Sequence, residues 1–452
     1  MNTAIATTLF QLNADLFPLT AAILASVACG VLGNFLVLRK LALMGDAISH
    51  AVLPGLVIAF LITTSRSPLI MFAGAAAAAL LTVVLVEAVK KLGKVEPGAA
   101  MGVVFSVLFA LGVLLIERAA VRHVDLDADC VLHGNLSFIG YGTTPETWNE
   151  LLSPDALHAI PRQVWTLLAA AAAAIAATAA LFKELRVAAF DPLFAGAVGL
   201  KPNALHYLLM TLVAAATVAS FEAVGSILVI AMLVCPAATA RLLTERLHTQ
   251  ITASVIIAAA TATLGYFAAT AVPAALGLDA VNAAGSIVAV AGLALAAATL
   301  ASPSHGLIAR SIRARRLART VHTEDLIAAL YRLRENRHPH PTIQTIQAQL
   351  PHLNANATAK RAERQSLAEA PTPNTLRLTE RGLRRAQNLV RRHRLWEAYL
   401  VEQAGLAPDH VHPTAHTLEH LPRAPDTAPQ TDPHGSPIPP PPQTPKTPKT
   451  PS

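Results

Sequence analysis

Long apolar segments separated by short charged segments occupy the first two thirds of the chain. Each apolar segment is about 20 residues long, the length of a helix that crosses a bilayer. The polar interruption at residues 221–223 is weak, so the apolar segments on either side of it count as one span or two. The pattern therefore predicts eight or nine spans and an all-α, polytopic membrane helix bundle. The expected spans are residues 18–38, 41–60, 68–89, 98–116, 164–182, 204–219, 224–240, 251–271 and 281–300.

The charged segments between the spans predict the orientation of the bundle. Arg39 and Lys40 end the first span, and Lys90 and Lys91 end the third. Because basic loops stay in the cytoplasm, the amino terminus is expected outside and the carboxyl terminus inside. The loop 117–161 is acidic, as an external loop can be, and the first 20 residues lack the basic start of a signal peptide. We therefore expect a multi-pass protein of a bacterial inner membrane.

Composition changes sharply near residue 300. Of 452 residues, 53% are apolar and 14% charged, but from residue 301 onward the chain carries a net charge of +9 and before it −2. This asymmetry predicts a water-exposed basic region behind a nearly neutral membrane domain. The proline-rich end of the chain is expected to be disordered. The predicted domains are a membrane domain (1–302), a basic juxtamembrane linker (303–321), a cytoplasmic helical domain (322–422) and a disordered tail (423–452).

The second span contains an ionisable pair. Asp46 and His50 are four residues apart and share one helix face. Pro54 cannot donate a hydrogen bond to the carbonyl of His50, so that oxygen stays available. Ionisable groups inside a membrane are expensive and are usually functional, although the pair could also serve helix packing. Carboxylate and imidazole suit manganese, zinc or ferrous iron rather than copper(I), whereas Met44 lies on the opposite side of the helix.

The string LALMGDAISHAVLPG around this pair resembles the signature of the permeases of ABC-type manganese, zinc and iron importers, the ABC-3 family. The resemblance continues through AAMGVVFSVLFALGVLLI, CVLHGNLSFI and GSILVIAMLVCPAATARLL. It implies a permease that pairs with a second copy or a close relative, with ATPase subunits and with an external metal-binding protein. It also implies that Asp46 and His50 bind the transported Mn²⁺, Zn²⁺ or Fe²⁺, without a permanently bound cofactor.

The chain has no GxxxxGK[ST] phosphate loop, so it is not expected to be an enzyme, and a partner must hydrolyse ATP. The segment FDPLFAGAVGL resembles the part of such permeases that docks on the ATPase, which implies that role for Asp191, Ala195 and Gly199. The alternative is an ordinary cytoplasmic loop. Glu87, four residues before Lys91, has the spacing of a solvated helix-end pair.

A second group of potential metal ligands lies near the end of the cytoplasmic domain. His416, Glu419 and His420 have the spacing that places three side chains on one helix face. The same spacing also occurs on solvent-exposed helices that bind nothing. From the spacing alone, both interpretations stay open.

The stretch LTERGLRRAQNLVRRHRLWEAYLVEQAGL followed by HTLEH resembles the metal-responsive repressors of the diphtheria-toxin and manganese-dependent regulator type. The resemblance implies a winged-helix and dimerisation-like domain whose regulatory metal is bound by Asp325, His393, Glu419 and His420. His416 stands where that family has Cys or Glu and can still be a ligand. Ala328 stands where a second ligand of the first helix is expected, which leaves one site incomplete.

The DNA-reading part of that fold would occupy residues 342–373, with a recognition helix at 357–367 and Lys360, Arg361 and Arg364 as phosphate contacts. The segment EAPTPNT predicts no clear wing, and a membrane tether hinders a search for DNA. We therefore expect a metal-sensing or dimerising module rather than a DNA-binding one. The alternatives are a secondary metal transporter and a membrane-anchored, metal-dependent transcription regulator.

Overall fold

The computed structural model describes two compact units, Met1–Ala309 and Arg310–Ser452. The described residues are 12–64, 67–120, 136–140, 160–279, 281–338, 340–421, 423–426 and 429–441. The predicted acidic loop lies almost entirely outside them, as do most of the amino-terminal segment and the last residues of the tail.

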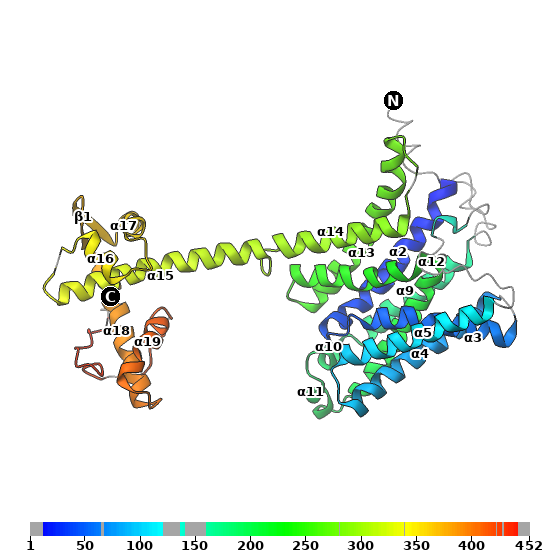
Figure 1. Cartoon of the computed structure of the whole chain (residues 1–452), viewed down its shortest axis with the longest axis horizontal. Helices are drawn as coiled ribbons and strands as arrows, with labels where there is room; N and C mark the ends of the chain where they lie inside the picture. Colours follow the sequence, from blue (N-terminus) through cyan, green and yellow to red (C-terminus); the bar gives the residue numbers. More distant parts are fainter. Residues whose placement is uncertain are drawn as a thin grey trace, which may run out of the picture. The chain divides into compact units, whose positions relative to one another are not determined.

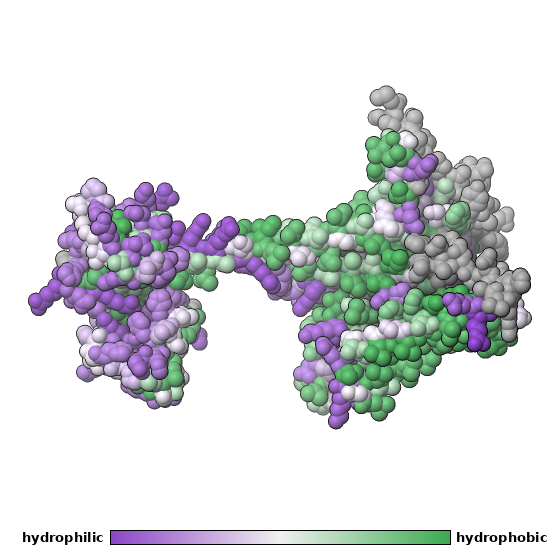
Figure 2. All heavy atoms as spheres, viewed as in Figure 1, coloured by the Kyte–Doolittle hydropathy of each residue, from purple (hydrophilic) through white to green (hydrophobic). Residues whose placement is uncertain are grey.

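The first unit is a bundle of helices, eight of which are long and apolar enough to cross a membrane within the described residues (Figure 1). Apolar side chains also cover much of its outer surface, as lipid contact requires (Figure 2). Its elements are α2 (Leu12–Leu38), α3 (Met44–Thr63), α4 (Pro68–Gly93), α5 (Pro97–Ala120), η1 (Leu136–Phe138), α9 (Arg162–Ala180), α10 (Phe182–Phe190), α11 (Pro192–Ala197), α12 (Pro202–Leu243), α13 (Leu247–Ala275) and α14 (Ala283–Ala301).

Helix α12 contains 42 residues, about twice what one crossing needs, and it is broken at Gly225. At its start, His206 accepts a hydrogen bond from Arg39, at the end of α2. Beyond its end, Gln250 of α13 donates to Asn34, also near the end of α2. Both ends of α12 therefore lie at the same end of α2. The chain must reverse direction within α12, so its two halves each run across the bundle.

Gly225 permits this break because its φ is +78°, a conformation that side chains disfavour. Among the described residues, eight helices can cross a membrane, or nine crossing segments if the two halves of α12 are counted separately, in agreement with the predicted eight or nine. The break lies just after residues 221–223, where the sequence placed it.

Small residues allow α3 and α4 to approach closely. A Cβ added at Gly55 would overlap the carbonyl of Gly74, and a Cβ at Gly74 would overlap Ala59. Such contacts replace the hydrophobic driving force that helices lack inside a membrane. They fix α3, and with it the Asp46 and His50 pair, against the rest of the bundle.

The second unit has the helix and strand order of a winged helix followed by two further helices (Figure 1). Its core joins Leu326 and Leu330 to Ile346, Ala359 and Leu376. The elements are α15 (Leu307–Glu335), whose first turn precedes the unit boundary, α16 (Ile343–Gln349), α17 (Ala355–Arg364), β1 (Ala368–Thr372), β2 (Thr375–Leu378), α18 (Glu380–Glu402), η2 (Pro408–His410) and α19 (His412–Leu418). The linker predicted at 303–321 is thus mostly helical.

The expectation that no wing is present is wrong. Strands β1 and β2 pair in antiparallel register, with Ala368 opposite Leu378 and Thr372 opposite Thr375. Pro373 and Asn374 form the turn between them, where proline is favoured. Pro371 is tolerated because a two-stranded sheet has only edge strands.

Part of the segment expected to be disordered is folded back on α18. Asp432 is buried and accepts backbone hydrogen bonds from His434 and Ser436. Arg394 donates to the carbonyl of Pro437 and pairs with Glu335 at 2.7 Å. Residues 429–441 therefore have more structure than their composition predicts.

Candidate metal sites

The first candidate site is the ionisable pair of α3. His50 Nε2 lies 3.2 Å from Asp46 Oδ1, and the two side chains are 21% and 32% exposed. The helical spacing of four residues produces this contact directly. The pair is thus accessible from outside the chain, as a site for a passing ion must be.

Aromatic rings of α5 hold the imidazole of His50. Its ring centre lies 5.0 Å from that of Phe105 and 5.4 Å from that of Phe109. Pro54 lies inside α3, so the His50 carbonyl has no intrahelical donor four residues on. One chain therefore offers one carboxylate, one imidazole and a free carbonyl, too few ligands to enclose a divalent ion.

The segment expected to contact an ATPase forms the short helix α11. Asp191 caps it by accepting a hydrogen bond from the Phe194 amide, and Gly199 follows it with φ of +84°. Ala195 is fully buried within the chain, so it serves the local fold. The exposed residues are large and apolar, namely Leu193 (88%) and Phe194 (56%). Leu193 and Phe194 were not predicted, because the small residues of this segment were expected to make the close contact with the ATPase.

The second candidate site joins α15 to α19 and brings together four of the five ligands expected in the cytoplasmic domain. One potential ligand atom from each of Asp325, His416, Glu419 and His420 lies within 4.8 Å of the others. Asp325 and Glu419 are buried. No well-directed hydrogen bond reaches Asp325 Oδ1, either carboxylate oxygen of Glu419 or His420 Nε2, although His420 Nε2 lies 3.2 Å from Asp325 Oδ1.

Buried carboxylates are costly unless their oxygens are well satisfied, and here the imidazoles that lie near them have poor hydrogen-bond geometry. Imidazole and carboxylate are the ligand types of first-row divalent metals. The chemistry and the orphaned atoms therefore fit a metal ion that these four residues would hold.

Charges around His420 favour its protonated form when no metal is bound. Burial alone would lower the pKa, but contacts with Asp325 and Glu324 and the charge of Glu419 raise the pKa of His420 to about 9. Glu324 lies 2.7 Å from His420 Nδ1 and is also paired with Arg385. Burial instead dominates at His416 and lowers its pKa.

A third group, His393, Glu397 and His412, lies beside the second. Glu397 Oε1 is 3.2 Å from His393 Nε2 and 2.9 Å from His412 Nδ1. Burial opposes ionisation of Glu397, but the two imidazoles outweigh it and lower its pKa to about 2. His393 Nδ1 also lies 2.5 Å from Glu419, so His393 connects the two groups.

The sequence analysis assigned His393 to the group of Asp325 and missed Glu397 and His412. Glu397 follows His393 by four residues, a spacing that could have revealed it. His412 lies on another element, so only the fold brings it near. Ala328 is buried against Leu389 and Val390.

The winged-helix part exposes basic residues. Lys360 and Arg364 are exposed on α17, and Arg361 is half-buried. Arg364, Arg381 and Arg385 line a cavity of about 360 Å³. Within the described residues, only Arg385 of these three arginines pairs with a carboxylate, that of Glu324.

Comparison with known families gives two matches along the chain. The ABC 3 transport family matches residues 16–302. The metal binding and dimerisation domain of iron dependent repressors matches residues 379–423. The two matches fall in the two compact units.

Similar proteins include the manganese transport system membrane protein MntD of Bacillus subtilis (strain 168), which is 39% identical over 64% of this chain and 93% of its own length. The zinc transport system membrane protein TroD of Treponema pallidum is 32% identical over 66% of this chain and 76% of its own length. The solved structure of PsaBC from Streptococcus pneumoniae in complex with Fab aligns with a TM-score of 0.53 and 29% identity, over 70% of this chain and all of that chain.

Proposed function

The chain belongs to the ABC 3 transport family, and on that premise we propose that it is the permease subunit of an importer for divalent transition-metal ions, driven by ATP hydrolysed on a partner. The names of the relatives support manganese or zinc as the ion. The observation that carries the proposal is the carboxylate and imidazole pair of α3, open on one side inside an apolar bundle.

In this proposal, Asp46 and His50 form half of a transit site. Two permease chains facing each other across a two-fold axis would bring together two carboxylates and two imidazoles. Four such ligands suffice for a first-row divalent ion. The phenylalanines on His50 hold the imidazole while the open side lets the ion leave.

The energy source is proposed to be an ATPase subunit that docks on α11. Exposed large apolar side chains on a short helix indicate a protein contact rather than a solvated loop. Leu193 and Phe194 supply that apolar surface, and Asp191 and Gly199 fix the ends of the helix. An external metal-binding protein is proposed to deliver the ion to the opposite side.

The second unit is proposed to read the metal concentration inside the cell. Its two adjacent ligand groups are the observation behind this role, since their buried carboxylates fit a retained ion. Asp325, His416, Glu419 and His420 would hold one ion, and His393, Glu397 and His412 a second. Metal bound here would neutralise the carboxylates, which changes the packing of α19 on α15 and slows transport when metal is plentiful.

Uptake of radioactive Mn²⁺ or Zn²⁺ by vesicles that contain the chain, its ATPase and its binding protein tests the transport proposal. Asp46→Ala and His50→Ala are expected to reduce ATP-dependent uptake to background while the complex still assembles. Asp279→Ala and His248→Ala remove exposed residues of the same types and are expected to leave uptake unchanged. Wild-type uptake by either α3 variant, or uptake without the ATPase, would overturn the proposal.

A second candidate function is metal-dependent nucleic-acid binding by the second unit. The wing formed by β1 and β2 and the arginines beside α17 favour it. A gel shift of the full chain on duplex DNA, with and without Mn²⁺, tests it across a salt series. If the second unit binds DNA, Lys360→Gln should lower the slope of log binding constant against log salt concentration by about 1. Absence of a metal-dependent gel shift would exclude this function.

A further inference from the structure

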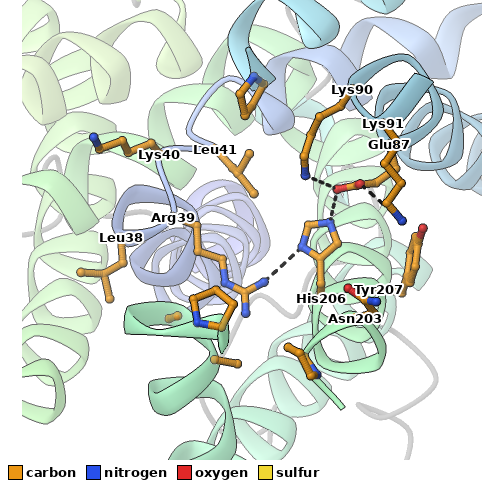
Figure 3. Close-up of a pocket in the computed structure, with 15 residues that line it drawn as sticks. Leu38, Arg39, Lys40, Leu41, Glu87, Lys90, Lys91, Asn203, His206 and Tyr207 are labelled. Carbon is orange, nitrogen blue, oxygen red and sulfur yellow. Dashed lines mark hydrogen bonds and ion pairs between the residues drawn. The ribbon is translucent and has the colours of Figure 1, made fainter. Parts of the chain in front are cut away.

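A polar cavity lies where the ends of α2 and α4 meet the start of α12 (Figure 3). It has a volume of about 430 Å³, and residues of α10 and α11 complete its wall. Arg39, Lys40, Lys90 and Lys91 line it together with a single carboxylate, that of Glu87. The cavity is therefore strongly positive at the edge of an apolar bundle.

Glu87 is buried and already compensated. Its carboxylate lies 2.8 Å from Lys90 Nζ and 2.9 Å from His206 Nε2, with Lys91 at 4.0 Å. The expected solvated pair of Glu87 and Lys91 is thus a buried cluster with further partners, because α12 packs over it. One carboxylate shared by two lysine ammonium groups cannot also neutralise Arg39.

The hydrogen bonds fix the protonation of His206. Arg39 Nη1 lies 3.1 Å from His206 Nδ1, and a guanidinium can only donate. Nδ1 is therefore the acceptor, so the hydrogen of the neutral imidazole resides on Nε2, which lies 2.9 Å from Glu87 Oε1. The neutral imidazole holds the guanidinium in place without neutralising its charge.

Arg39 is left as a positive group seeking an anion. Its Nε is buried without a hydrogen-bond partner, and no carboxylate in the described part of the chain pairs with it. In Figure 3, Arg39 and Lys90 point toward the Glu87 and His206 pair, whereas Lys40 extends away from it. A guanidinium that is held in place by His206 and has no carboxylate partner in the described part of the chain, together with the ammonium of Lys90 in the same cavity, suits phosphate recognition.

The remaining wall is apolar and lies at the level where the spans end. Leu38, Leu41 and Pro97 line the cavity, and Lys91 lies 5.9 Å from the ring centre of Tyr207. Leu92 on α4 is 86% exposed beside it. A free anion uses only the charged half of such a cavity, but a phospholipid also uses the apolar half and the exposed face of α4.

We propose that this cavity binds the headgroup phosphate of an anionic phospholipid, with Arg39 and Lys90 as the main contacts. Basic pockets between the ends of membrane helices are suited to such headgroups. The bound lipid joins α2, α4 and α12 next to α11, the helix proposed to contact the ATPase. A metal site is disfavoured here because the one carboxylate that lines the cavity, that of Glu87, is already paired with Lys90 and Lys91.

The purified full-length chain in detergent tests this proposal by native mass spectrometry with phosphatidylglycerol. Arg39→Gln and Lys90→Gln are each expected to weaken the first bound lipid about fivefold, the contribution of one basic residue at a membrane surface. Lys183→Gln removes an exposed charge of α10 that does not line the cavity, and it should bind as wild type does. Arg39→Lys keeps the charge but loses hydrogen-bond donors. Its affinity for phosphatidylglycerol should lie between those of the wild type and Arg39→Gln.

Controls separate the lipid from other sources of the same chemistry. Phosphatidylcholine, whose choline ammonium offsets the charge of its phosphate, should bind more weakly than phosphatidylglycerol, and millimolar inorganic phosphate should not displace phosphatidylglycerol. Displacement by phosphate would overturn the lipid assignment in favour of a free anion. Equal affinity in wild type, Arg39→Gln and Lys90→Gln would overturn the site itself. Because Lys90 is 36% exposed, its variant tests the site even if Arg39→Gln does not fold.

Discussion

The two groups of metal-ligand residues differ in how completely one chain builds them. The pair of α3 supplies two side chains, 32% and 21% exposed, which already contact each other. The second unit supplies seven side chains in two adjoining groups, and the carboxylates of Asp325 and Glu419 are only 2% and 1% exposed. An open, half-built site releases an ion easily, whereas a closed one with orphaned atoms retains it. This difference is what the proposed function requires, with transit of the ion at the first group and retention at the second.

Removing a buried ligand of the second unit tests this difference with the largest effect. Glu419→Gln is expected to weaken Mn²⁺ binding to the purified full-length chain by at least the 10- to 100-fold typical of metal-site partners. Calorimetric titration measures it, and Glu402→Gln, an exposed acid on α18, is the control. Unchanged affinity in Glu419→Gln would remove the contrast between the two regions.

The pH dependence of metal binding sharpens the comparison. The pKa of His420 is about 9, so at pH 7 a metal ion must displace its proton. Affinity at the second unit should therefore rise with pH, up to about tenfold per unit, and level off near pH 9. Titrations at pH 7, 8 and 9 measure this rise, and His420→Gln should flatten it.

The same shift predicts the stability of the metal-free second unit. A pKa raised above the unfolded value stabilises the fold fully below pH 6.5, and this contribution disappears as pH rises to about 9. Thermal unfolding of the metal-free full-length chain should show a falling midpoint for this unit across that window. His420→Gln should remove most of the fall, and an unaltered fall would assign it to other groups.

The smallest expected effect concerns energy transfer to the membrane unit. Phe194→Ala should slow ATP-dependent uptake about tenfold, because truncating an aromatic side chain at the centre of an interface weakens docking by about 2 kcal/mol or less. Metal binding by the second unit should not change. Leu276→Ala, which truncates an exposed apolar residue outside α11, is the control for uptake. Wild-type uptake by Phe194→Ala would argue against docking on α11.

Features that depend on residues close together in the sequence could be predicted from the sequence alone. The spans follow from apolar length, and Asp46 with His50 or His416 with Glu419 and His420 follow from helical spacing. Features made by pairing across the fold could not. His412 joins Glu397 only because α19 packs on α18, and Asp432 reaches Arg394 of α18, at 3.6 Å, only because the chain folds back on that helix.

Two local errors have physical causes. The wing was missed because Pro371 and Pro373 suggest a loop, although both fit an edge strand and its turn. Glu87 was expected in solvent because its spacing to Lys91 is that of a surface pair. The covering helix α12, which brings His206 to it, is more than a hundred residues away in sequence.

Counting tightly bound metal in the purified full-length chain tests the division of roles most directly. Wild type, His50→Ala and Glu419→Gln chains are dialysed against buffered Mn²⁺ and their metal content is measured by mass spectrometry. We expect His50→Ala to keep the wild-type content and Glu419→Gln to lose retained metal. Loss of metal in His50→Ala with full content in Glu419→Gln would contradict the account.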